Sequence, residues 1–216
     1  MSSLCIFDLD GTLIDSRLDL ANSVNATLAE AGKAPLEHPV IFSYVGNGAP
    51  VLVRKALGPQ ATEEQVAHSL RFFLDYYRDH AMDDTSLYPG VREALDRLHA
   101  GGVQLAVLTN KPVRISESIM ETLGLTSMLF RVYGGNSFEQ KKPNPIGIDT
   151  LRKEAGKSAD ETWMVGDSIV DMQTARNAGV RSCGVTYGFQ PETLGACPPD
   201  LLVDRMEDFA AHVLKG

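Results

Sequence analysis

Two aspartates, Asp8 and Asp10, stand at the end of an apolar run near the start of the chain, in the segment IFDLDGTLID at 6–15. Carboxylates are costly to bury and are uncommon in strands. Two of them one residue apart after a strand-like run therefore indicate a chemical role. Because side chains alternate along a strand, both carboxylates are expected to point the same way.

Other polar residues follow later strand-like segments or stand at the start of the next helix. In chain order they are Thr109, Asn110, Lys142, Asp167 and Asp171. In an open parallel sheet, ligands bind at the carboxyl ends of the strands, near the point where the strand order reverses. We therefore expect these residues to converge with the first aspartate pair on one site.

This donor set suits a hard cation that prefers oxygen ligands. Mg²⁺ binds through one or two carboxylates and also takes ligands from substrate phosphates. The sequence has no cluster of His and Cys that would favour zinc. We expect Mg²⁺ to be bound by Asp8, by Asp167 and by the backbone carbonyl of Asp10. Asp171 is expected not to bind the ion directly but to hold a water molecule or Asp167.

With the metal in place, the same residues could transfer a phosphoryl group. Asp8 would attack phosphorus to form an aspartyl-phosphate, while Asp10 would protonate the leaving oxygen and later activate water. Lys142 and the Thr109 hydroxyl would hold the phosphoryl oxygens, and Asn110 is a further expected substrate contact. Catalysis of this kind is mostly positioning and electrostatic stabilisation.

Each residue also has an ordinary explanation when it is taken alone. Asp167 and Asp171 could cap a helix. Lys142 could be a surface lysine, Thr109 an ordinary strand-end hydroxyl, and Asn110 could merely form a turn. The functional interpretation rests on their occurring together.

The elements that must position these residues follow from the apolar pattern. Strand-like runs alternate with helical patterns from about residue 90 onwards, which predicts an α/β fold with a Rossmann-like parallel sheet between helices. One expected strand ends at Phe7. The others cover 103–110, 128–135, 162–167, 181–188 and 201–203. The expected helices cover about 91–98, 115–123, 145–156, 168–179 and 207–214.

Residues 16–82 interrupt this alternation, because they contain helical patterns and no convincing strand. The expected helices there cover 16–32, 49–58 and 63–81. A helical domain, 16–82, is therefore predicted as an insertion into a core that consists of 1–15 and 83–216.

One loop of the insertion, Gly46, Asn47 and Gly48, could close over a substrate or could simply form a turn before a helix. Arg54 could bind a substrate carboxylate or lie on a solvated face.

The composition restricts the partners. The chain has 216 residues and a formal net charge of −8, which would be repelled by nucleic acid and by anionic membranes. A small phosphorylated metabolite is the expected partner, and the chain is expected to be a monomer or homodimer. Three cysteines without a CxxC pair and the lack of a targeting pattern or apolar span favour a cytoplasmic protein.

Four segments together resemble the motifs of the haloacid dehalogenase-like superfamily. They are DLDGT (8–12), LTN (108–110), KKP (141–143) and GDSIVD (166–171). The resemblance implies that superfamily's fold, with the insertion as its helical cap. Dehalogenases and phosphonate-cleaving members lack an Asp at the position of Asp10, so this residue implies phosphate ester hydrolysis or a phosphoryl shift.

Within the superfamily, the chain resembles the phosphoglycolate phosphatases in YVGNGAPVLVRKAL (44–57), LYPGV (87–91), TNKP (109–112) and VTYGF (185–189). That family implies Mg²⁺-dependent hydrolysis of 2-phosphoglycolate to glycolate and phosphate. One departure is Ile146-Gly147 after KKPNP, where many relatives have a further proline. It alters the helix start rather than the role of Lys142.

Other functions stay open at this point. A sugar-phosphate mutase of the same superfamily would use the same acids, and relatives could hydrolyse nucleotides or pyrophosphate. A signalling receiver domain also gathers acids, a Thr and a Lys, but it is smaller, has no helical insertion, and carries its phosphoacceptor after a middle strand.

Overall fold

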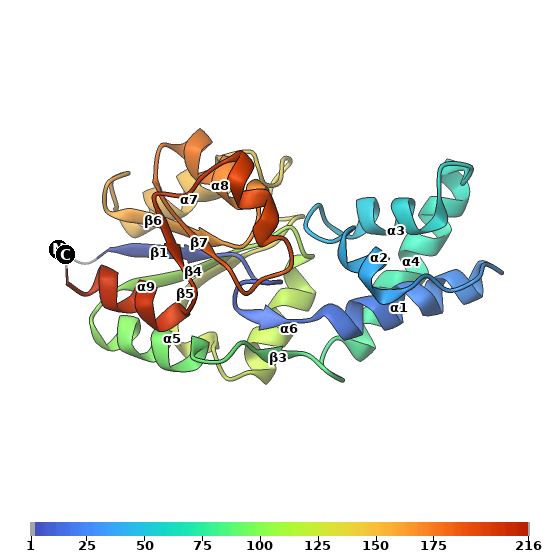
Figure 1. The fold of residues 1–216 in the computed structure, drawn as a ribbon, viewed down its shortest axis with the longest axis horizontal. Coiled ribbons are helices and arrows are strands. Elements are labelled where there is room, and N and C mark those ends of the chain that lie inside the picture. The colour runs from blue at the N-terminus through green and yellow to red at the C-terminus, as the bar shows by residue number, and fades with distance from the viewer. Residues whose placement is uncertain (1–2, 216) are drawn as a thin grey trace. The chain divides into compact units, whose positions relative to one another are not determined.

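A computed structural model describes residues 3–215 of the chain. The chain divides into two compact units (Figure 1). The first comprises Met1–Asp15 and Leu87–Gly216, and the second comprises Ser16–Ser86. The chain thus returns from the second unit to the first after Ser86, whereas the sequence pattern placed the end of the helical insertion at residue 82.

The first unit is built on a six-stranded parallel sheet in the order β5–β4–β1–β6–β7–β8. Its strands are β1 (Leu4–Phe7), β4 (Gln104–Leu108), β5 (Leu129–Tyr133), β6 (Thr162–Gly166), β7 (Arg181–Val185) and β8 (Leu201–Val203). The chain runs outwards from β1 through β4 to β5, then crosses back to β6 and runs outwards the other way. The strand order therefore reverses at β1, where a ligand site is expected.

Helices cover both faces of this sheet (Figure 1). The helices of the first unit are α5 (Val91–Ala100), α6 (Val113–Thr122), α7 (Ile146–Ala155), α8 (Ile169–Ala178) and α9 (Met206–Val213), with 3₁₀ turns η1 (Thr126–Met128) and η2 (Pro191–Ala196). The predicted Rossmann-like α/β core is confirmed.

Strand β1 is fully buried because it lies in the middle of the sheet. Leu4 and Ile6 pack with residues of α7 and α8 in one apolar cluster. Phe7 points to the opposite face, where its ring meets Phe209 of α9 edge-on at 6.0 Å between centroids. Burial on both faces explains why this strand is a continuous apolar run up to its last residue.

The second unit contains helices only, apart from Ser86 at its end. They are α1 (Arg17–Glu30), α2 (His38–Phe42), α3 (Ala49–Leu57) and α4 (Glu63–His80). Three of the four were predicted, and α2 was not, because five residues are too few to show a helical stripe. Thr62 and Gln65 form a capping box that starts α4.

Two further strands, β2 (Ile14–Asp15) and β3 (Ser86–Leu87), form a separate two-stranded sheet that the sequence did not predict. The cysteines Cys5, Cys183 and Cys197 are free, as expected from their number and spacing, and the structure buries all three. Over residues 3–215, every helix is too short or too polar to cross a membrane.

A buried carboxylate connects the two ends of the second unit. Asp19 in the first turn of α1 accepts the backbone N–H groups of Asp84 and Thr85 and the Thr85 hydroxyl, the last at 2.7 Å. Its side chain is excluded from solvent. These bonds tie the start of α1 to the segment that leaves α4.

Replacing Asp19 by Ala is expected to destabilise the protein by about 2 kcal/mol, because several buried donors lose their acceptor. Urea unfolding followed by circular dichroism measures the change. Asp75→Ala is the matched control, since the Asp75 side chain is 71% exposed and makes only a surface ion pair. Equal losses of stability in the two variants would contradict the bracing role of Asp19.

Candidate active site

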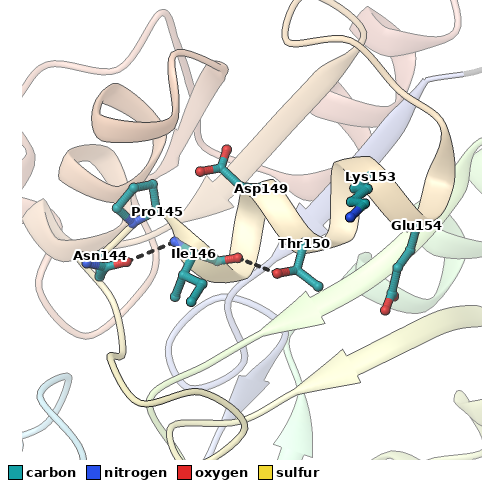
Figure 2. A pocket seen from close by; sticks show the side chains of 7 residues that line it. All are labelled: Asn144, Pro145, Ile146, Asp149, Thr150, Lys153 and Glu154. Carbon is teal, nitrogen blue, oxygen red and sulfur yellow. Dashed lines mark hydrogen bonds between the residues drawn. The ribbon is translucent and has the colours of Figure 1, made fainter.

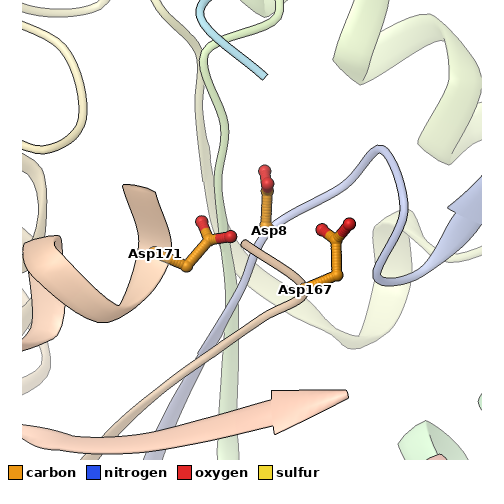
Figure 3. Close-up of side chains that lie close together, drawn as sticks. All are labelled: Asp8, Asp167 and Asp171. Atoms are coloured by element: carbon orange, nitrogen blue, oxygen red, sulfur yellow. The ribbon is translucent and has the colours of Figure 1, made fainter. Parts of the chain in front are cut away.

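The carboxyl ends of β1 and β6 bring three acids together. Asp8 follows β1, Asp167 follows β6, and Asp171 lies in the first turn of α8. Each offers a carboxylate oxygen, and the three oxygens lie within 4.8 Å of one another. Figure 3 shows the Asp8 carboxylate standing between the other two.

Lys142 joins two of these acids from the loop between β5 and α7. Its Nζ lies 2.8 Å from Asp8 Oδ1 and 2.7 Å from Asp171 Oδ1, and its side chain is only 2% exposed. Burial disfavours the charged amine, but Asp171 and Asp8 outweigh it and raise the pKa of Lys142. The ammonium group therefore stays charged inside the cluster.

One lysine does not neutralise the cluster. Burial, together with repulsion from Asp171 and Asp167, raises the pKa of Asp8 to about 8 although Lys142 acts in the opposite direction. Burial and repulsion from Asp171 likewise raise the pKa of Asp167 to about 7. The hydrogen bonds from the backbone N–H groups of Phe189 and Gln190 lower it, but by less. Negative charge is thus held here at a cost in free energy.

Asp171 is fixed on both oxygens. Its Oδ1 accepts from Lys142, and its Oδ2 accepts the hydroxyl and the backbone N–H of Ser168, which precedes α8. A methyl group at Gly166 would overlap the Asp171 side chain, so the residue at the end of β6 must be glycine for Asp171 to fit. Asp171 is accordingly a support for Lys142.

A second ion pair contains a residue that sequence reasoning missed. The Nζ of Lys111 lies 2.7 Å from Asp10 Oδ1, and the Lys111 side chain is only 3% exposed. Lys111 directly follows Thr109 and Asn110 after β4. This position beside two predicted site residues is the sequence feature that could have identified it. Each of the two acids that follow β1 is therefore paired with its own buried lysine.

Thr109 and Asn110 are also buried at the end of β4. The Thr109 hydroxyl accepts the backbone N–H of Lys111, and the Asn110 amide donates to the carbonyl oxygen of Lys142 at 3.1 Å. Asn110 thus braces the Lys142 segment. Its contact with a substrate, and that of Thr109, stay predictions.

The remaining predicted substrate contacts lie in the second unit. Gly46 and Gly48 adopt positive φ, and Gly48 caps α3, so this loop does form the turn before a helix. Arg54 is 48% exposed and makes a two-pronged pair with Glu63, at 2.8 and 2.5 Å. That pair favours the solvated face for Arg54, and the role of Gly46, Asn47 and Gly48 towards substrate stays a prediction.

A hollow of about 640 Å³ runs along α7 (Figure 2). It is lined by Asn144, Pro145, Ile146, Asp149, Thr150, Lys153 and Glu154. Asn144 accepts from the Ile146 N–H, and Thr150 donates to the Ile146 carbonyl, so these groups are already used within the helix. None of the clustered acids lines this hollow, and it is no part of the site.

The residues of the site fit a divalent cation. Among the described residues of the site, four carboxylates, those of Asp8, Asp10, Asp167 and Asp171, face the two ammonium groups of Lys111 and Lys142. Carboxylate oxygens are the ligands that Mg²⁺ prefers, and a cation would lower the repulsion that raises the pKa of Asp8 and Asp167.

Known proteins resemble the chain over most of its length. A family model described as haloacid dehalogenase-like hydrolase matches residues 5–185. The phosphoglycolate phosphatases of Vibrio parahaemolyticus and Agrobacterium fabrum are 37% and 38% identical, covering 95% and 98% of this chain and 93% and 91% of theirs. The crystal structure of a predicted phosphoglycolate phosphatase from Haemophilus somnus superposes with a TM-score of 0.90 at 32% identity, covering 98% of this chain and 97% of that one.

Replacing Asp8 by Asn is expected to stabilise the metal-free protein, increasingly so as the pH rises from 5 to 8. Because the pKa of Asp8 is raised to about 8, the folded state holds a proton that the unfolded state has lost, and stability falls as pH rises through this window. The uncharged Asn avoids this loss.

Thermal melts in EDTA at several pH values measure the difference in Tm between variant and wild type, which should grow by several degrees. Asp96→Asn is the control, because Asp96 is exposed on α5. A difference in Tm that does not change with pH would contradict the crowding of charge around Asp8.

Proposed function

Because the chain belongs to the haloacid dehalogenase-like hydrolase family and is a phosphoric monoester hydrolase within it, we propose that it hydrolyses 2-phosphoglycolate to glycolate and phosphate with Mg²⁺. The observation that carries the reaction type is the pair of acids after β1, each with its own buried lysine. The names of its relatives support the choice of substrate.

The first half of the reaction uses Asp8 as the nucleophile. Lys142 and the Leu9 N–H both bond Oδ1, which fixes the direction of the carboxylate. A carboxylate oxygen of Asp8 forms a bond to phosphorus as the bond from phosphorus to the glycolate oxygen breaks. Asp10 donates the proton that the leaving oxygen takes up.

The second half releases phosphate. Asp10 removes a proton from a water molecule whose oxygen attacks phosphorus, and the bond from phosphorus to Asp8 breaks, so that Asp8 is regenerated. Asp8 and Asp167, with the backbone carbonyl of Asp10, would hold Mg²⁺, and Asp171 supports them through Lys142. When bound, the ion withdraws charge from the phosphoryl oxygens and offsets the acids around it.

Asp8→Asn is expected to reduce phosphate release more than about 1,000-fold, because the amide is a poor nucleophile and the covalent step is lost. Steady-state phosphate release from 2-phosphoglycolate measures the loss, and circular dichroism shows whether the variant is folded. Asp96→Asn should retain full activity. Turnover retained by a folded Asp8→Asn protein would contradict the assignment of the nucleophile.

A panel of phosphomonoesters tests the substrate. 2-Phosphoglycolate should give the highest kcat/KM, by at least about tenfold, over a nucleoside monophosphate, pyrophosphate and glucose 1-phosphate. EDTA should abolish release and added Mg²⁺ should restore it. A flat profile would defeat 2-phosphoglycolate as the substrate, and an isomerised sugar phosphate formed only with a bisphosphate activator would establish a mutase instead.

A further inference from the structure

The loop Gly188–Gln190 lies against Asp167, although Gly188 follows Asp167 by 21 residues in the chain. It follows β7 and leads into η2. Apart from the resemblance of VTYGF (185–189) to a family segment, no sequence feature indicated a role for this loop. Its contacts in the structure are with an acid of the site.

Two successive backbone N–H groups of this loop bond one oxygen of Asp167. Phe189 donates to Oδ2 at 2.7 Å, and Gln190 donates to the same oxygen at 3.2 Å. The other oxygen, Oδ1, accepts the hydroxyl of Thr12 at 3.2 Å. Asp167 is thus held by groups from two different loops.

The loop approaches Asp167 so closely that only glycine fits at its first position. A methyl group at Gly188 would overlap the Cβ of Asp167 and the carbonyl oxygen of Gly11. Gly11, on the other side, is equally tight, because a methyl group there would overlap the Asp167 carboxylate. The Asp167 side chain is therefore enclosed between the loops that follow β1 and β7.

We propose that the Gly188–Gln190 loop is a positioning element that presents Asp167 to the metal ion through Oδ1 alone. A carboxylate oxygen has about two acceptor sites. The amides of Phe189 and Gln190 fill both sites of Oδ2, whereas among the described residues only Thr12 bonds Oδ1. This inference rests on the proposed function, because it assumes that a divalent cation binds at Asp167.

The two backbone N–H groups do more than occupy the acceptor sites of Oδ2. They fix the rotation of the carboxylate, so that Oδ1 needs no reorganisation when the cation arrives, and such supports of a metal ligand contribute strongly to metal affinity. The loop contacts Asp167 through backbone atoms, so its effect depends on the space at Gly188 rather than on the side chains of Phe189 and Gln190.

Gly188→Ala tests the proposal, because the methyl group must push the loop away from Asp167. We expect the dissociation constant for MgCl₂, measured by isothermal titration calorimetry on the full chain, to rise about 10- to 100-fold. Gly195→Ala is the matched control, since Gly195 lies in η2 just beyond the loop and has open space around its Cβ position. Its affinity should equal that of the wild type.

The outcomes separate the two proposals. A folded Gly188→Ala protein that binds Mg²⁺ as tightly as wild type would overturn the role of the loop and leave the proposed function standing. A wild-type protein that binds no Mg²⁺ would overturn both.

Amide hydrogen exchange on the wild type, followed by NMR, keeps the test decisive if Gly188→Ala does not fold. The N–H groups of Phe189 and Gln190 should exchange slowly, and more slowly with MgCl₂ present, because ligation holds Asp167 and hence the loop. Exchange of both groups at the rate of a free peptide, with and without MgCl₂, would refute the positioning role.

Discussion

The buried ammonium group of Lys142, in contact with Asp8 and Asp171, is the interaction on which the site depends. Asp8, which follows β1, and Asp171, in the first turn of α8, repel each other when they are buried, and the ammonium group of Lys142 between them offsets that repulsion. The lysine is supplied by a third segment, after β5, and Asn110 at the end of β4 holds the backbone of that segment. Four parts of the first unit therefore have to be in place at once.

Lys142 compensates only part of the negative charge of the acids. The repulsion that remains, together with burial, raises the pKa values of Asp8 and Asp167. The strand that precedes Asp8 is buried along its whole length. β1 packs on α7 and α8 through one face and on α9 through the other. Unbalanced negative charge of this kind favours the binding of a cation, which the carboxylate oxygens of the site fit.

Much of the first unit could be predicted from the sequence. The alternation of apolar strands and helices fixed the α/β class, and polar residues at strand ends pointed to one edge of the sheet. The structure places Asp8, Lys142, Asp167 and Asp171 together there. α2, β2 and β3 were missed because segments of two to five residues carry no periodic signal. Lys111 was missed because a lysine after a strand looks like any surface lysine until its partner is known.

The sequence by itself determined which residue types stand at the strand ends, since those follow from local spacing, and the motifs they form identify the family. The pairings were decided by the tertiary structure. Lys111 meets Asp10 because β4 lies beside β1, and Phe189 meets Asp167 because β7 lies beside β6. Strand order depends on which strand edges form hydrogen bonds with each other, a choice made between distant segments that the local pattern of either one does not record.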